Sequence, residues 1–387
     1  MRQSNVSFVP NPTDSEIYHV TYPDEVMFAF NPCIFTIEGN LKGATVIFYK
    51  VGGVMEELLA VPMHSGISGK VTMDVREYVQ YLFERGYTES NEGLNYFGDV
   101  DYENVQKSGL ATRVSYSIAV EMADGTVRRS NTMFEGLAIW GALKIGGDEV
   151  FNAFRTVTWF RNYPFTFSIY AHGGGSILFC KDGVASRFVN INERGLWNVP
   201  LLSDDDVKGF YLIKDCTGAF VEMTFDTTFD LTFRYSGGGV KTDKLRINVD
   251  DSDTGIYLRW INRHGMYSYW LFKKGTESHR TSMGEYMLNN LKSYDMKYGY
   301  QGAYGKRQRV ERSQSVAVCA PLVDSDTWDL LMDVASSPMV DMFMGYEDGE
   351  PRWMSVSVDG GTLEKTGEVL QDFEIEINLP DVAVQSF

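Results

Sequence analysis

The feature that most constrains this chain is an alternation of apolar and polar residues with a period of two. In residues 373–379, Phe, Ile, Ile and Leu alternate with Glu, Glu and Asn. Only an extended strand places every second side chain on the same face, so this segment predicts a strand with one buried and one solvated face. The same alternation recurs in residues 113–123, and the Asp124-Gly125 pair that follows predicts a tight hairpin turn. The chain is therefore predicted to consist mainly of strands.

The length of 387 residues exceeds what one ordinary hydrophobic core supports. The 24 Phe, 22 Tyr and 37 Gly favour strands and tight turns over helices. We predict a mainly β fold with two or three antiparallel β-sandwich-like domains and a few short helices. The predicted domains are residues 1–139, with one helix, a long loop and a candidate ring-forming surface; residues 140–240, a middle β domain; and residues 241–387, with an aromatic hairpin and a short helix.

Two segments have helical spacing instead. In residues 75–85, Val75, Tyr78, Val79 and Leu82 fall on one side of a helix, and Gly86 ends it. Residues 326–335 predict a short helix with an acidic first turn, and Pro338 stops its continuation. These are the helices expected in an otherwise β chain.

The formal net charge of −17 argues against a nucleic-acid-binding surface, because binding to phosphates requires concentrated Lys and Arg. No stretch approaches the apolar length that a membrane-spanning helix needs, and the first residues lack the layout of a secretory signal. We therefore expect no membrane span, and synthesis in a cytoplasm-like compartment. The four cysteines, Cys33, Cys180, Cys216 and Cys319, lie far apart and form no CxxC pair, so we expect reduced thiols and no structural zinc site.

The sequence carries no recognisable catalytic motif. Its five histidines are scattered, and the zinc-protease, nucleophile-elbow and phosphate-loop patterns are absent. We therefore predict no enzyme activity, catalytic residue, cofactor or metal site, although residues far apart in sequence could still assemble into a catalytic group.

An aromatic hairpin is predicted in residues 255–272, GIYLRWINRHGMYSYWLF, where the tetrad 262–265 forms the turn. Its large rings are Tyr257, Trp260, Tyr267, Tyr269 and Trp270. Rings of this kind fill a core, anchor a protein interface or stack on a sugar, and all three alternatives stay open.

Basic residues gather in one short segment of this acidic chain. Residues 294–312 are rich in Gly and Tyr and contain Lys306, Arg307, Arg309 and Arg312 near their end. The segment is predicted to be either a mobile solvated loop or an arm that docks on an acidic face of a neighbouring copy. The second alternative supplies the head-to-tail complementarity that builds rings.

Several stretches together resemble tail proteins of bacteriophages and prophages of Bacteroides-like bacteria. They are DEVMFAFNPCIFTIEG at residues 24–39, the aromatic hairpin, and the closing SSPMVDMF, RWMSVSVDG and LQDFEIEINLPDVAVQ. The closing layout, a Trp-x-x-Val strand followed by a spacer and an alternating acidic strand, is similar to that of distal tail and baseplate proteins.

The resemblance implies a virion structural protein, assembled in the host cytoplasm, that links the tail tube to the host-recognition proteins. It implies β-sandwich domains in a homo-oligomeric ring, commonly a hexamer, with the tail tube, the hub and receptor-binding proteins as partners. It supplies no catalytic residue. The alternative from another class is a carbohydrate-binding β-sandwich protein, either an adhesin or a binder of host glycans.

Overall fold

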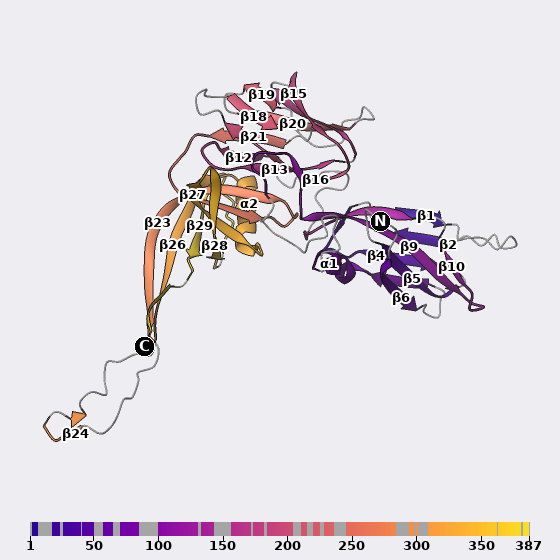
Figure 1. The fold of residues 1–387 in the computed structure, drawn as a ribbon, viewed down its shortest axis with the longest axis horizontal. Helices are drawn as coiled ribbons and strands as arrows, with labels where there is room; N and C mark the ends of the chain where they lie inside the picture. The colour runs from indigo at the N-terminus through magenta and orange to yellow at the C-terminus, as the bar shows by residue number, and fades with distance from the viewer. Residues whose placement is uncertain are drawn as a thin grey trace. The chain divides into compact units, whose positions relative to one another are not determined.

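The computed structural model describes most of the chain (Figure 1). The described residues are 2–6, 18–23, 26–39, 41–49, 57–64, 70–84, 100–130, 133–142, 156–171, 173–181, 184–203, 210–214, 220–224, 228–235, 245–283, 294–297, 299–300, 309–361, 363–380 and 382–386. They form 30 strands and two helices, which confirms the mainly β class.

The chain divides into two compact units. The first holds Met1–Asp250 and Ile261–Tyr267, and the second holds Asp251–Trp260 and Ser268–Phe387. This division differs from the three predicted domains. The predicted domains 1–139 and 140–240 both fall in the first unit, which also contains the tip of the aromatic hairpin.

The first unit begins with two sheets. One has the order β1 (Arg2–Val6), β2 (Tyr18–Tyr22), β4 (Ile34–Glu38) and β7 (Lys70–Asp74). The other has the order β3 (Val26–Phe28), β11 (Phe134–Ile139), β9 (Ala111–Met122), β5 (Leu41–Tyr49) and β6 (Glu57–His64), with β10 (Val127–Arg129) paired to β9. The ring of Phe35 on β4 meets that of Tyr116 on β9 edge to face, with centroids 5.1 Å apart. The two sheets therefore share one core, as in a sandwich.

Two elements that were predicted from local sequence patterns, a helix and a hairpin turn, are present in this part of the chain. Helix α1 spans Arg76–Glu84 and buries Val79, Leu82 and Phe83, so the helical spacing is confirmed. The predicted hairpin turn lies between β9 and β10, where Gly125 adopts φ +88° and Asp124 accepts a hydrogen bond from the Thr126 amide at 2.8 Å. A glycine occupies this left-handed conformation without strain.

Three further sheets complete the first unit. One has the order β12 (Thr156–Phe160), β21 (Leu245–Asp250), β20 (Thr228–Tyr235), β14 (Gly175–Lys181) and β15 (Val184–Ile191), in which β12 and β21 run parallel. Another has the order β13 (Thr166–Ala171), β16 (Gly195–Pro200) and β8 (Gln106–Lys107), and the last has the order β17 (Leu202–Ser203), β18 (Phe210–Lys214) and β19 (Phe220–Thr224). Because β8 precedes residue 139 and pairs with β16, a sheet crosses the predicted domain boundary.

A shared hydrophobic cluster explains why residues from all three predicted domains form this unit. Its buried members are Phe28, Leu137, Ile139, Tyr170, Leu196 and Met266. Met266 comes from the turn of the aromatic hairpin, whose chain is held by a hydrogen bond from the Ala142 amide to the Arg263 carbonyl at 2.6 Å. A Cβ on Gly265, at φ +73°, would lie 2.5 Å from the Trp140 carbonyl oxygen, so only glycine fits this contact.

The second unit contains a closed ring of six strands. They pair in the order β23 (Tyr267–Met283), β22 (Ile256–Ile261), β27 (Val340–Glu347), β28 (Glu350–Asp359), β29 (Gln371–Asn378) and β26 (Arg309–Val323), and β26 pairs again with β23. β30 (Val382–Ser386) adds to β26, and β24 (Tyr294–Asp295) with β25 (Gly299–Tyr300) forms a separate two-stranded pair. Closure gives each of the six strands a neighbour on both sides.

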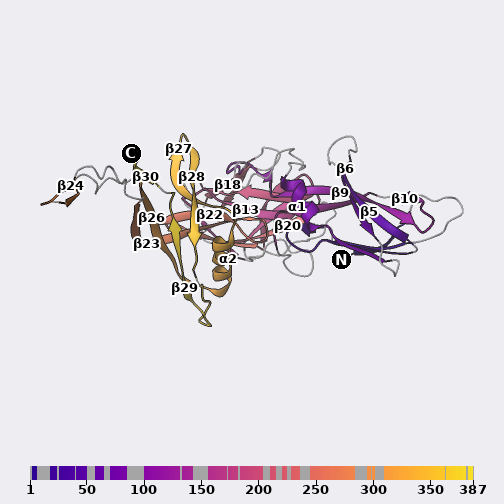
Figure 2. The same cartoon turned by 90° about the horizontal axis from the view of Figure 1, so that it is seen from below.

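Helix α2, Ser325–Ser336, covers part of this ring (Figure 2). The Asp324 carboxylate accepts a hydrogen bond from the Thr327 amide at 2.8 Å and caps the helix N-terminus. Trp328 of the helix meets Phe373 of β29 edge to face at 5.7 Å between centroids. Both the predicted helix and the alternating strand after it are confirmed, with their apolar faces packed on each other.

Candidate functional site

The longest strands of the second unit extend past the closed ring as a ribbon. We define the ribbon as residues 273–283 of β23 and residues 309–314 of β26; Figure 1 shows the two strands side by side. β23 pairs with β26 from Lys273 opposite Cys319 to Met283 opposite Val310. On the far side of β26, β30 pairs with residues 309–312. β22 begins at Ile256 and ends its hairpin pairing near residue 272, so the outer edge of β23 beyond that point has no described strand beside it.

The ribbon is exposed and basic. Every residue from 273 to 281 is exposed. The ribbon carries five basic residues, Lys273, Lys274, Arg280, Arg309 and Arg312, against two acidic ones, Glu277 and Glu311. The Nη2 atom of Arg312 lies 2.9 Å from Nδ1 of His279 across the two strands. The ribbon thus has a positive charge in a chain whose net charge is −17.

Two of the four basic residues predicted as an interface lie in this ribbon. Arg309 and Arg312 belong to β26, which corrects the prediction of a loop or arm running to residue 312. The correction has a physical cause, since residues 309–312 gain strand pairs on both edges, from β23 and β30. Lys306 and Arg307 lie outside the described residues.

An acidic row faces outward on the same unit. We define it as Asp359 of β28 and Asp372, Glu374 and Glu376 of β29; all four are exposed. Asp359 stands opposite Glu376 in the strand register. Like charges directly opposite one another destabilise a sheet, so a cationic partner over this row would relieve the repulsion.

The pKa of the Cys319 thiol reflects the negative charges of the acidic row. Cys319 lies on β26 between Lys273 and Glu374 in the register. Its pKa is raised above the usual value, first by burial and then by the charges of Asp372 and Glu374, while Lys273 lowers it. The acidic carboxylates therefore outweigh the single lysine at this position.

The aromatic hairpin supplies core residues. Tyr257, Trp260, Tyr267 and Tyr269 are at most 7% exposed, and Trp270 is half-buried. Tyr257 stacks on Tyr269 with centroids 6.0 Å apart. Because a sugar platform or a partner contact needs an open ring face, this burial corrects the glycan or partner contact predicted for these four residues and supports the core alternative.

A buried ion pair crosses the interior of the second unit. The Arg259 guanidinium donates to Oδ2 of Asp341 from Nε at 3.1 Å and from Nη2 at 2.8 Å. Oδ1 of Asp341 accepts a hydrogen bond from Ser355 at 2.7 Å, and the Arg259 guanidinium carbon lies 4.2 Å from the centroid of the Trp353 ring. Sequence reasoning missed this pair, because the two residues are 82 positions apart.

The described part of the chain holds no group of three or more His, Cys, Asp or Glu residues arranged to bind a metal ion. Of the two helices found among the described residues, neither is long and apolar enough to span a membrane.

The acidic row was also missed as a candidate site. Its signal was present in the alternation of residues 373–379, which predicted an outward acidic face for Glu374 and Glu376. The sequence could not show that Asp359 lies opposite Glu376, because this contact depends on the pairing of β28 with β29.

Comparison with models of known protein families and with curated proteins finds no match for this chain.

Proposed function

We propose that this chain is a non-enzymatic structural protein of a bacteriophage tail, and that its copies associate head to tail into a ring. The observation that carries the proposal is the ribbon: a basic extension of a closed ring of strands, in which residues 273–281 are exposed and one edge, the open edge, has no described strand beside it. In the proposed ring, the ribbon of one copy lies against the acidic row of the next. The assignment to a phage tail, in the distal tail or baseplate, rests on the resemblance of the segments at the two ends of the chain.

The open edge supports association because unpaired main-chain N–H and C=O groups are a ready template for another chain. The edge runs over residues 273–283, about twice the length of a typical strand. The charges give the contact a direction, since a basic ribbon meeting an acidic row is a heterologous contact between different surfaces. Such contacts generate rings when the rotation between copies closes.

The test replaces Lys306, Arg307, Arg309 and Arg312 with serine and measures the oligomer mass by light scattering at low and high salt. The unchanged protein is expected to form a defined oligomer whose mass falls as salt rises, because salt screens contacts between exposed charges. The variant is expected to stay smaller at low salt.

A charge-matched control replaces Lys42, Lys70, Arg129 and Arg352, which are exposed and lie outside the ribbon. The control is expected to keep the oligomer mass of the unchanged protein. Equal masses for the four-serine variant and the unchanged protein would reject these four basic residues as part of the interface, and negative-stain images without rings would reject the ring itself.

A further inference from the structure

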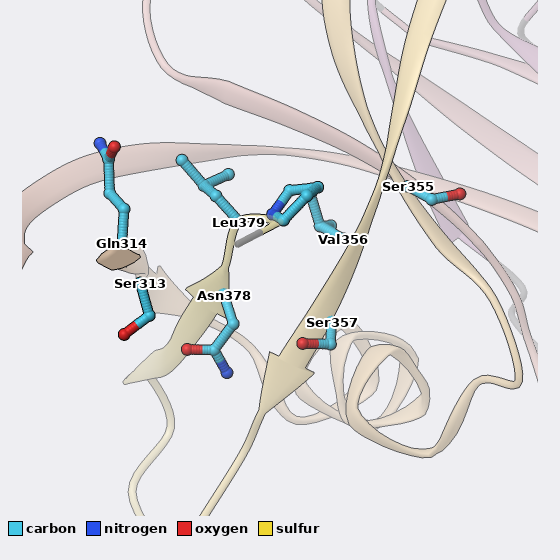
Figure 3. A pocket seen from close by; sticks show the side chains of 8 residues that line it. Ser313, Gln314, Ser355, Val356, Ser357, Asn378 and Leu379 are labelled. Atoms are coloured by element: carbon cyan, nitrogen blue, oxygen red, sulfur yellow. The ribbon is translucent and has the colours of Figure 1, made fainter. Parts of the chain in front are cut away.

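A pocket of about 430 Å³ lies in the second unit, where β28 leaves β29 (Figure 3). Residues 357–359 of β28 pair with β29, whereas residues 350–356 pair with β27. On its other side β29 stays with β26, because the Leu379 amide donates to the Gln314 carbonyl at 2.9 Å. The pocket is therefore the gap that opens when two strands of the ring separate. It lies within the range of roughly 300–1,000 Å³ typical of small-molecule sites.

The lining is uncharged and combines polar with apolar residues. Its residues are Ser313, Gln314, Ser355, Val356, Ser357, Asn378, Leu379 and Pro380. The hydroxyls of Ser313 and Ser355 donate to the Arg280 carbonyl and to the Asp341 carboxylate, and their lone pairs stay able to accept. The side chains of Gln314, Ser357 and Asn378 have no hydrogen bond to another described residue.

The side chains of the lining lie on two sides of the strands. Figure 3 shows Ser313, Ser357 and Asn378 on one side of the strands, whereas Gln314 and Leu379 point to the other. The separation follows from the alternation of side chains along each strand. A ligand in the gap would meet the hydroxyls of Ser313 and Ser357 and the Asn378 carboxamide on one face, and the Gln314 carboxamide with the aliphatic groups of Val356 and Leu379 on the other.

We propose that this pocket binds a neutral sugar, as a single ring or as the terminal residue of a glycan. Sugar hydroxyls donate and accept hydrogen bonds, and so do the serine hydroxyls and carboxamides of the lining. The C–H face of a pyranose ring is apolar and fits the aliphatic side of the gap. The pocket lies at a different place from the aromatic hairpin. Ser313 and Gln314 of its lining belong to the ribbon, so the sugar site adjoins the interface proposed between copies.

The charges around the pocket select against other ligands. No lining residue is ionisable, so the pocket has no counter-charge for a phosphate or a carboxylate. Glu376 and Asp359 of the acidic row lie two positions along the register from the pairing of Asn378 with Ser357, and their negative charges disfavour an anion. We therefore expect neutral sugars to bind more tightly than anionic ones.

The experiment is saturation-transfer NMR on the full-length chain. The probes are glucose, galactose, mannose, N-acetylglucosamine and N-acetylgalactosamine, with N-acetylneuraminic acid as the anionic comparison. At least one neutral sugar is expected to receive saturation, and the anionic sugar is expected to receive less. Light scattering on the same samples reports the oligomer mass, so failure of the sugar site and failure of ring formation are distinguished.

Two variants test the location. Asn378→Ala combined with Ser357→Ala is expected to weaken binding at least about tenfold, since two hydrogen bonds are lost. Ser357→Trp fills the gap from an exposed position and is expected to abolish binding, whereas Ser336→Trp, at an exposed serine at the end of α2, is expected to leave it unchanged. No transfer to any neutral sugar, or transfer that persists in Ser357→Trp, overturns the proposal, and protection of residues 355–357 from hydrogen exchange on oligomer formation, without sugar binding, assigns the gap to a second copy instead.

Discussion

One strand, β23, passes through two environments, one buried and one exposed. Residues 267–272 are buried except for half-buried Trp270, and they belong to the part of β23 that forms the aromatic hairpin with β22. Residues 273–281 are all exposed, and β26 is the strand that pairs with them. The first part is held by the core of its own chain. The second has no core of its own, so its length and charge are explained by our proposal that another copy covers it.

The largest expected effect comes from opening a cavity at a fully buried side chain of the second unit. Trp260 is fully buried, and Trp260→Ala is expected to lower the free energy of unfolding by about 3–5 kcal/mol. The matched change in the ribbon is Thr281→Ala, at an exposed position, with an expected effect below about 0.5 kcal/mol. Chemical denaturation followed by circular dichroism measures both. Similar losses for the two variants would remove the distinction between ring and ribbon.

A smaller loss is expected when the buried ion pair is broken. Asp341→Ala leaves the Arg259 guanidinium buried without its carboxylate, and the expected loss is about 3 kcal/mol. Glu347→Ala removes the partner of Arg352 in a pair whose side chains are at least 60% exposed, and its expected loss is at most about 1 kcal/mol. The same denaturation experiment compares them, and an equal effect would show that burial of the Arg259–Asp341 pair does not add to the cost of breaking it.

The smallest effect concerns the electrostatic potential beside the acidic row. Asp372→Asn combined with Glu374→Gln removes two charges that raise the pKa of Cys319, so its pKa falls and its thiolate fraction at mildly alkaline pH increases. Faster labelling of Cys319 by a thiol reagent is expected, and slower labelling is expected in Lys273→Gln, which removes the charge that lowers the pKa.

The labelling is measured with Cys180 and Cys216 replaced by serine. Cys33 serves as the internal reference, because burial, followed by the charge of Asp74, raises the pKa of its thiol to about 12. A Cys319 rate that does not change in either variant would show that the row exerts no field there.

Local patterns predicted the local elements of this protein. The spacing of Val75, Val79 and Leu82 placed α1, and the acidic start before Trp328 placed α2. Both helices depend on contacts within a few residues, which a single sequence displays. The hairpin turn at 262–265 is confirmed for the same reason, since the Asn262 side chain accepts a hydrogen bond from the His264 amide at 3.0 Å.

Pairings between distant segments were not predictable in the same way. Residues 309–312 were interpreted as part of a loop or arm, and they became strand because β23 and β30 lie on either side. The predicted boundary at residue 139 failed to separate two sheets because β8 pairs with β16, far along the chain. In both cases the local sequence does not indicate which distant strand will pair with it.

The sequence by itself determined the mainly β class, the two helices, the aromatic hairpin and the outward acidic face of Glu374 and Glu376, because alternation and capping act over a few residues. Only the tertiary structure decided that six strands close into a ring, that the aromatic rings fill a core, and that a basic ribbon leaves the ring with no described strand along one edge. These outcomes depend on which strands meet, and strand pairing is set by the burial of whole sheets and not by any one segment.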